Sequence, residues 1–504
     1  MIYGSVPFPD IRTIQSFFAY IKAFNMAFLL SIIISGFLLR LINITDPILE
    51  VAMWRQCDTA GIARNFYYYG MNIFYPQMVG GGLINAYAGE LEFQIYPFAV
   101  AILYKLFGVH EYLGRLVSIV AFCGGAFFLY KLARKYFDKI PCLIALLFYT
   151  FNPYMFFYSR SFQPDSSMIF FSIAMLYFFS EWIDKEGLWR FVLMTLCAAL
   201  AFLVKLPAVC LGLPLLYLSI KKYRYNFIIQ WKLWLFAALT LIPIVLWSVH
   251  SYNLGQTAEG VPVGNYKLSG LSTYMDPWFY YRVFYAEIFE SCLIYIGGIL
   301  FVLGIVFTIK KNELRYIHYW LLAIIISFFL GGSGTAWHTY HTITIIAPAS
   351  LLIGYIIGNS AKLINENNIT GKTRVVLLAL SVSMAVSLPL ISYHKITGRY
   401  KAKRLEKDYP IYKVGKIVDE IIPKNDPIIG SLWGGPEILY YSNRRGWAIN
   451  TIGCSIESIE ALKKAGAKYF VTTALEAMDK KLMNYLQYRC ETIRSTKKYL
   501  IVKL

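Results

Sequence analysis

Long apolar runs alternate with short basic connections from about residue 23 to residue 392. A helix needs about 20 apolar residues to cross the roughly 30 Å hydrocarbon core of a bilayer. The pattern therefore predicts an all-α polytopic membrane domain with about eleven spans. These spans are expected at approximately 23–41, 112–131, 140–157, 166–183, 189–204, 207–220, 233–250, 289–309, 317–332, 342–358 and 374–392.

The basic connections predict how the spans are oriented, because short loops rich in Lys and Arg stay on the cytoplasmic side. Counting the run 96–108 as a span would break the alternation of these loops. It has only 13 residues, so we expect a juxtamembrane helix that lies at the interface. The segments 42–111, 158–165, 251–288 and 333–341 then fall on the outer side of the cytoplasmic (inner) membrane. The basic loops are Lys131/Arg134/Lys135/Lys139, Lys185/Arg190, Lys221/Lys222/Arg224, Lys310/Lys311/Arg315 and Lys362/Lys372/Arg374.

The last part of the chain has a different pattern, with more charges and shorter apolar runs. Alternating stretches such as PIIGSLW, RGWAIN, KYFVTT and KYLIVKL are typical of short strands, and SIESIEALKKAG of a helix. We expect a catalytic transmembrane domain at 1–394, whose first outer loop is 42–111. A small α/β domain at 395–504 is expected on the outer side.

Composition agrees with a membrane protein, since 58% of the 504 residues are hydrophobic and only 15% are charged. The formal net charge of +19 falls largely in the short loops, where it faces anionic headgroups. Membrane lipids are therefore the expected partners of this charge, and nucleic acid is not. The eight cysteines show no CxxC or Cys/His spacing that would mark a metal site.

Polar residues gather at the outer ends of the spans. Arg55, Asp58 and Arg64 lie close together in the first outer segment, and Glu90 and Glu92 precede the juxtamembrane helix. Glu90 is also readily explained as a solvated surface acid, whereas Glu92 stands at the edge of an apolar run. These residues predict acidic groups at the membrane surface.

Two further charged residues are harder to explain by the bilayer alone. Asp165 directly precedes an apolar span, where a helix cap and a functional carboxylate are both open interpretations. Lys205 interrupts an apolar stretch, and an ammonium there is costly unless it snorkels or meets an anion such as phosphate. Pro207 beside it suggests a break between two spans at the outer face.

The last outer loop sets His338, Tyr340 and His341 just before a span. Two histidines three residues apart are able to share one face of a helix and to bind a metal or a phosphate. An interfacial pair without ligand remains an alternative, and Tyr340 also fits an aromatic belt.

In this order, these motifs resemble the GT-C superfamily of polytopic glycosyltransferases, especially the family 39 group. That group includes protein O-mannosyltransferases and the lipid A aminoarabinose transferase. The resemblance covers roughly residues 20–360. It is carried by WRQCDTAGIARNFY, GELEFQIYP with LYKLFGVHEYLGRLVS, SRSFQPDSSMIFF and FLVKLPA.

The resemblance implies roles for individual residues. Asp58 matches the catalytic acid of the first outer loop, Asp165 the acid that opens the next outer connection, and Glu92 the acid before the juxtamembrane helix. Lys205 matches the lysine that contacts the donor phosphate. Cofactors are not required by this chemistry, although Asp58 and Asp165 with the His pair are candidates to hold a divalent metal.

The expected activity is transfer of a sugar from a polyprenyl phosphate carrier to a lipid, glycan or protein acceptor, with inversion at the anomeric carbon. A carboxylate takes the acceptor proton, and cations stabilise the departing phosphate. Asp58 is the candidate base, and Arg55, Glu90 and Tyr340 are expected to line the substrate cavity. A transporter or flippase for a lipid-linked sugar is the main alternative, and a non-catalytic assembly protein is a second. The candidate phosphate ligands are Lys205, Arg64, Arg160, His338 and His341.

Overall fold

The computed structural model describes residues 11–83, 86–87, 92–257, 270–360, 383, 390–391 and 409–504. In the first helix the side chains are described from Met26 onward, and in the helix that ends at Thr257 up to Gly255. Predictions for Glu90, for the span 374–392 and for the domain boundary at 394/395 lie outside these residues.

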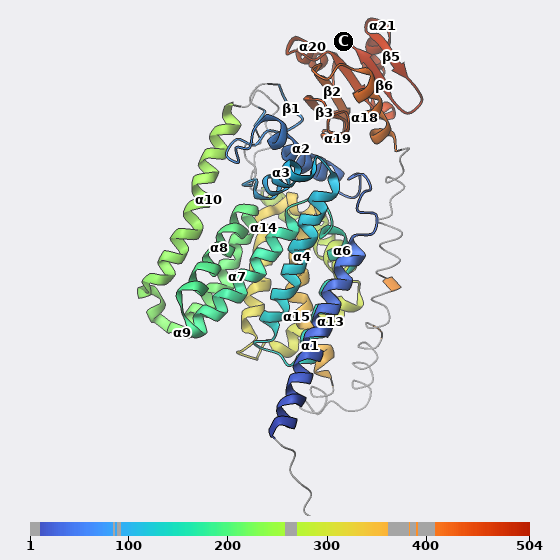
Figure 1. The fold of residues 1–504 in the computed structure, drawn as a ribbon. Coiled ribbons are helices and arrows are strands. Elements are labelled where there is room, and N and C mark those ends of the chain that lie inside the picture. Colours follow the sequence, from blue (N-terminus) through green and yellow to red (C-terminus); the bar gives the residue numbers. More distant parts are fainter. Residues whose placement is uncertain are drawn as a thin grey trace, which may run out of the picture.

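A bundle of apolar helices forms the larger part of the chain (Figure 1). Five of the described helices are long and apolar enough to cross a membrane, or six if one sharply bent pair is one span. Every predicted span within the described residues coincides with helical structure, so the prediction of a multi-pass helical membrane protein is confirmed. The number of eleven spans stays a prediction. The bundle helices are α1 (Ile11–Arg40), α4 (Glu111–Ala133), α5 (Lys139–Phe151), α6 (Pro153–Tyr158), α7 (Asp165–Lys185), α8 (Leu188–Val204), α9 (Gly212–Tyr223), α10 (Trp231–Thr257), α13 (Ile296–Thr308), α14 (Arg315–Trp337) and α15 (Ile346–Gly358).

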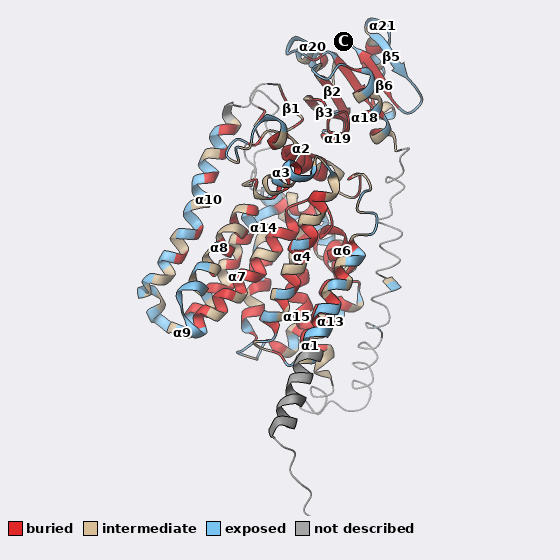
Figure 2. Cartoon of the chain, in the orientation of Figure 1, coloured by how far each residue is buried: buried red, intermediate tan, exposed pale blue. Residues whose placement is uncertain are grey.

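Shorter helical segments connect the bundle helices. They are η1 (Leu206–Leu211), η2 (Arg224–Ile229), α11 (Leu271–Met275), α12 (Pro277–Tyr280), the π-helix η3 (Tyr281–Cys292) and η4 (Thr339–Ile345). Buried side chains concentrate on α4, α5, α7 and α15, while α10 exposes apolar side chains along its length (Figure 2). Leu246 and Val249 of α10 are 65% and 58% exposed. Such a surface is stable against lipid rather than against water.

One predicted span differs in the structure. The run 289–309 is not one continuous helix, because Pro277–Cys292 and Ile296–Thr308 meet at an angle of 107°. The chain turns through left-handed conformations at Ile294 (φ 58°) and Tyr295 (φ 53°), which no regular helix contains. The hydrophobicity of the run carried no signal for this break.

The segment 42–111 places two helices across one end of the bundle (Figure 1). They are α2 (Met53–Tyr69) and α3 (Ile95–Phe107). The helix α3 matches the juxtamembrane helix predicted at 96–108. Leu106 and Phe107 at its end are 69% and 59% exposed, as suits an interfacial helix.

The C-terminal part is a small α/β domain, as predicted, and it lies beyond α2 and α3 at the same end of the bundle (Figure 1). Its sheet has the order β1-β3-β2-β4-β6-β5, with β2 parallel to both β3 and β4 and the other pairs antiparallel. Its elements are α18 (Pro410–Ile421), β2 (Ile428–Leu432), α19 (Glu437–Tyr441), β3 (Gly446–Asn450), α20 (Ile456–Lys464), β4 (Tyr469–Thr472), η6 (Leu475–Ala477), α21 (Lys480–Arg489), β5 (Glu491–Ser495) and β6 (Leu500–Lys503).

The strand β1 (Gly81–Gly82) comes from the segment 42–111 and completes this sheet. It pairs with β3 at the register Gly81↔Trp447 and Gly82↔Gly446. Gly446 has φ 150°, and a Cβ there would lie 1.9 Å from the carbonyl oxygen of Ile428, so only glycine fits. The sheet therefore joins two parts of the chain that the sequence analysis assigned to different domains.

Side chains also join the C-terminal domain to α2. Cys57 and Ala60 of α2 share one buried apolar cluster with Ile438 and Leu439 of α19. The hydroxyl of Tyr441 accepts a hydrogen bond of 2.9 Å from the backbone N–H of Ile48. This shared packing holds α19 against the helix that carries Asp58.

Candidate functional site

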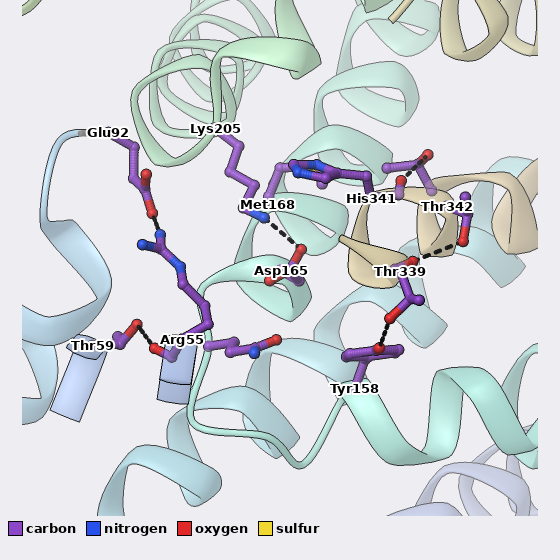
Figure 3. A network of polar contacts seen from close by, with 12 residues as sticks. Arg55, Thr59, Glu92, Tyr158, Asp165, Met168, Lys205, Thr339, His341 and Thr342 are labelled. Carbon is purple, nitrogen blue, oxygen red and sulfur yellow. Dashed lines mark hydrogen bonds and ion pairs between the residues drawn. The ribbon is translucent and has the colours of Figure 1, made fainter. Parts of the chain in front are cut away.

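A buried ion pair forms the centre of the site. Lys205 Nζ donates to Asp165 Oδ1 at 2.7 Å, and the side chains are 7% and 1% exposed (Figure 3). Lys205 follows the last residue of α8 in an extended conformation (φ −154°), and Pro207 lies in the first turn of η1, so the helix breaks here as predicted. Asp165 is the first residue of α7, where the helix dipole stabilises its negative charge.

A second charged group comes from the segment 42–111. Arg55 forms an ion pair with Glu92 (Figure 3), and its Nη1 lies 3.6 Å from Asp58 Oδ2. The backbone N–H of Phe93 donates to the carbonyl of Leu203 at 3.1 Å, which fixes Glu92 beside the end of α8. Burial raises the pKa of Asp58, and the charge of Arg55 partly opposes this rise.

The Lys205–Asp165 pair and the Arg55–Glu92 pair are neighbours. The charge of Arg55 lies within electrostatic range of the Lys205 ammonium group. The ammonium also lies 4.5 Å from the centre of the Tyr340 ring, a favourable cation–π geometry. The structure therefore brings together residues that the sequence places in four separate segments: Arg55, Asp58, Glu92, Asp165, Lys205 and Tyr340.

The predicted histidines border the same place. The ring centres of His338 and His341 are 6.2 Å apart, and His338 lies 5.2 Å from the ring of Trp54. Burial, together with the charges of Arg55 and Lys205, lowers the pKa of His338. A neutral imidazole there donates or accepts a hydrogen bond without adding charge.

Two carboxylate oxygens in the site are buried without a hydrogen-bond partner among the described residues. They are Asp58 Oδ1 and Asp165 Oδ2. A buried polar atom without a partner is costly, and in native proteins it commonly marks a place where a ligand or water binds. Each of these two oxygens is therefore able to accept a hydrogen bond that no described residue donates.

Two of the predicted phosphate ligands, Arg64 and Arg160, lie elsewhere. Arg64 Nη1 donates to the carbonyl of Tyr440 in the C-terminal domain at 2.8 Å. Arg160 Nη2 donates to the carbonyl of Asn43 at 3.0 Å, in the loop that follows α1. Glu90 lies outside the described residues. Neither arginine is therefore a neighbour of Lys205 in the way that Arg55 is.

Glu437 is a site residue that the sequence analysis missed. It lies in α19 of the C-terminal domain, is only 3% exposed, and its Oε2 has no hydrogen-bond partner among the described residues. Burial, with the charge of Asp58 in addition, raises the pKa of Glu437 to about 7. Nothing in its local pattern distinguishes Glu437 from a solvated acid at a helix start, because only the docking of α19 on α2 brings it near Asp58.

An apolar cavity of about 30 Å³ lies inside the bundle between α7, η1 and α14. Met168 of α7, Pro207 of η1 and Trp320 of α14 line it. Met168 follows Asp165 by one turn of α7 (Figure 3). The charged pair therefore stands at the boundary between polar and apolar surroundings.

The candidate metal ligands do not form a metal site among the described residues. No three His, Cys, Asp or Glu side chains converge within the described parts of the chain. Asp58 and Asp165 each lie beside a cation of the protein, Arg55 and Lys205 respectively. The described donor set thus does not fit a metal site, and no step is assigned to a metal.

The arrangement of the helical bundle, the juxtamembrane helices and the α/β domain is shared with proteins of known structure. A family model described as dolichyl-phosphate-mannose-protein mannosyltransferase matches residues 95–250. An uncharacterized protein of Aquifex aeolicus (strain VF5) is 31% identical over 104 residues, or 21% of this chain. That match spans only 23% of the relative's length.

Two solved structures extend the likeness over nearly the whole chain. ArnT from Cupriavidus metallidurans bound to undecaprenyl phosphate is similar with a TM-score of 0.60 at 13% identity, covering 95% of this chain and 97% of that chain. AglB from Archaeoglobus fulgidus, in complex with an inhibitory peptide and a dolichol-phosphate, also gives 0.60 at 13% identity. It covers 90% of this chain and 70% of that chain. At this identity the likeness establishes the fold.

Proposed function

We propose that this chain is a membrane glycosyltransferase that moves a sugar from a polyprenyl phosphate carrier to an acceptor hydroxyl. The reaction takes place at the outer face of the cytoplasmic membrane and inverts the anomeric configuration. The observation that carries the proposal is the buried Lys205–Asp165 pair beside Arg55 and Asp58. The likeness to ArnT and AglB supports it, because those structures contain undecaprenyl phosphate and dolichol-phosphate.

Lys205 and Arg55 bind the donor phosphate in this proposal. Lys205 acts as a compact point charge, whereas the planar guanidinium of Arg55 is able to contact two oxygens. His338 and His341 lie close enough to donate hydrogen bonds as secondary ligands. Stabilising the negative charge of the leaving phosphate lowers the barrier, because that charge increases in the transition state.

Asp58 is the proposed base. The acceptor oxygen forms a bond to the anomeric carbon while the bond from that carbon to the phosphate oxygen breaks. The acceptor proton passes to the Asp58 carboxylate, and the electron pair of the broken bond leaves on the polyprenyl phosphate. Burial raises the pKa of Asp58, which makes its carboxylate a stronger base than a solvated aspartate.

Asp165 and Glu92 are positioning residues. Each forms an ion pair with one of the two cations, Asp165 with Lys205 and Glu92 with Arg55. Fixed geometry matters because a preorganised cation stabilises developing charge without having to reorganise during the reaction. The exposed apolar faces of the bundle are a surface along which the prenyl chain is able to lie.

Mass spectrometry of the cell envelope tests the proposed activity. Cells that lack the gene should lose one sugar mass from a surface glycolipid, glycan or glycoprotein, and the wild-type gene should restore it. The Asp58→Asn and Lys205→Met variants should not restore it. A flippase would instead leave the polyprenyl phosphate sugar intact in reconstituted vesicles that contain only the protein, the donor and an acceptor. Release of free polyprenyl phosphate that depends on the protein is the result that favours a transferase.

A further inference from the structure

A second cavity lies between α2 and the C-terminal domain. Its volume is about 210 Å³, larger than engineered cavities of about 150 Å³ that accept a benzene ring. One sugar ring therefore fits into it. The walls come from the last turns of α2, from the chain before and after β1, and from the loops around 424–427 and 443–445.

The walls carry an excess of positive charge. Arg64, Lys424 and Arg445 line the cavity. Asp426 also lines it, but its carboxylate forms an ion pair with Lys468. Arg444 lines the cavity too, but its guanidinium is paired with Asp419. Since this acid–base balance leaves Arg64, Lys424 and Arg445, these three cations give the cavity an attraction for anions.

Both arginines are held in place by aromatic rings and retain donor groups. The guanidinium of Arg445 lies 4.0 Å from the centre of the Tyr69 ring, and that of Arg64 lies 4.7 Å from the Tyr440 ring. Arg445 Nε is buried and has no hydrogen-bond partner in the part of the chain that the structure describes. A guanidinium has five N–H donors in a planar fork, which suits a phosphate or carboxylate group.

Uncharged groups complete the wall. Tyr68 and Tyr69 are 54% and 56% exposed, so each presents a flat apolar face with a hydroxyl at its tip. Asn65 adds a side-chain amide, whose Nδ2 donates to the carbonyl of Gln77. Aromatic faces beside amide and guanidinium donors match a ligand that has both C–H surfaces and hydroxyl groups, as sugars do.

The cavity is also close to the proposed base. Asn65 and Asp58 are seven residues apart on α2 and so share one side of the helix, about 10 Å apart along its axis. A short saccharide bridges that distance. The cavity therefore borders the side of α2 that carries Asp58.

We propose that the cavity between α2 and the C-terminal domain is an acceptor subsite for an anionic sugar, one that carries a phosphate or a carboxylate group. The inference rests on the proposed transferase function and adds the chemical class of the acceptor. It also assigns a role to the C-terminal domain, which supplies Lys424 and Arg445, while α2 supplies Arg64.

Thermal unfolding of the purified full-length protein in detergent, with three sugars as probes, tests the subsite. Glucose 6-phosphate and glucuronate represent the two anionic groups, and glucose is the uncharged control, all at equal ionic strength. We expect at least one anionic sugar to raise the unfolding temperature in a saturable way and glucose to have no effect. Arg445→Gln should weaken binding by about tenfold or more, the value of one charge-assisted hydrogen bond.

Three further variants distinguish anion binding in this cavity from a general effect of surface charge and from binding at the donor site. Lys424→Gln, at an exposed position, should weaken binding without risk to folding. Lys497→Gln removes the same charge from the turn between β5 and β6, at the opposite edge of the sheet, and should leave binding unchanged. The double variant Lys205→Met with Asp165→Asn removes the donor phosphate ligand without leaving a buried unpaired carboxylate, and it should also leave binding unchanged. Loss of binding in this double variant with retention in Arg445→Gln would overturn the inference and leave the proposed function intact, as would equal effects of glucose and both anionic sugars.

Discussion

The ammonium group of Lys205 lies 2.7 Å from Oδ1 of Asp165, and neither side chain has appreciable contact with solvent. Burying two charges costs several kcal/mol per ion, and a well-packed apolar pair of similar volume is often as stable or more so. The pair is therefore not explained by stability alone. Its position beside Arg55 and the apolar interior fits a cation prepared for a phosphate.

Removing one partner of the pair should destabilise the protein strongly. Lys205→Met leaves the Asp165 carboxylate buried without its cation, and we expect a loss of about 3–5 kcal/mol in the free energy of unfolding. The double variant Lys205→Met with Asp165→Asn should regain most of this stability and still fail to bind undecaprenyl phosphate. Thermal unfolding and lipid binding in detergent measure both. Full lipid binding by the double variant would argue against a role of Lys205 in the site.

Replacing the proposed base should slow sugar transfer without weakening the binding of the donor lipid. Asp58→Asn preserves the shape of the side chain but removes its ability to take a proton. We expect the transfer rate in reconstituted membranes to fall roughly 10²- to 10⁴-fold. Undecaprenyl phosphate binding should stay within about twofold of the wild type, because Lys205 and Arg55 remain in place. Unchanged transfer by Asp58→Asn would remove the carboxylate from the mechanism.

Glu437 should make the stability of the protein depend on pH. Burial and the charge of Asp58 raise the pKa of its carboxyl group from 4.5 to about 7. Between these values the folded chain binds more protons than the unfolded chain, so stability falls as the pH rises through this window. The full effect is no more than about 3 kcal/mol. Unfolding temperatures measured from about pH 5 to about pH 8 should decrease.

The matched variants for this prediction are Glu437→Gln and Glu457→Gln. Glu437→Gln cannot ionise, so its unfolding temperature should decrease less over the same window and exceed that of the wild type at the alkaline end. Glu457 lies in the first turn of α20, is exposed, and has a pKa below its usual value, so its replacement should leave this window unchanged. The same slope in Glu437→Gln as in the wild type would show that other groups cause it.

Cysteine labelling tests the predicted orientation of the chain in the membrane. Asp138 lies in the basic loop between α4 and α5, and Lys497 lies in the turn between β5 and β6, both exposed. In intact cells we expect Asp138→Cys to react only with a membrane-permeant thiol reagent and Lys497→Cys to react with impermeant ones as well. The protein without either substitution serves as the control that measures labelling of its native cysteines. The reverse pattern would place the site on the cytoplasmic side.

Much of the membrane domain was predictable because its signals, apolar runs and isolated charges, lie in short stretches of sequence. Apolar runs of span length identified the helices, and a charge at the end of such a run is unusual enough to stand out, as with Asp165 and Lys205. The strands and helices of the C-terminal domain followed from alternation and turn residues. Glu92 and Asp58 were placed near the site because both lie in the segment 42–111.

Contacts between distant segments were beyond this reasoning. Nothing in the two residues of β1 predicts that they join the sheet of the C-terminal domain, and Glu437 gains its neighbour Asp58 only through that docking. Arg64 looked like a phosphate ligand because it follows Asp58 by less than two turns of helix. The helix directs it instead to Tyr440 and the second cavity.

A structure of the protein with bound undecaprenyl phosphate, determined by cryo-electron microscopy, would show where the donor phosphate binds. We expect a phosphate oxygen within about 3 Å of Lys205 Nζ, with Arg55 as a second ligand and the Asp58 carboxylate facing the same phosphate. A phosphate bound elsewhere, with the Lys205–Asp165 pair undisturbed and shielded from it by packed side chains, would show that Lys205 does not bind the donor.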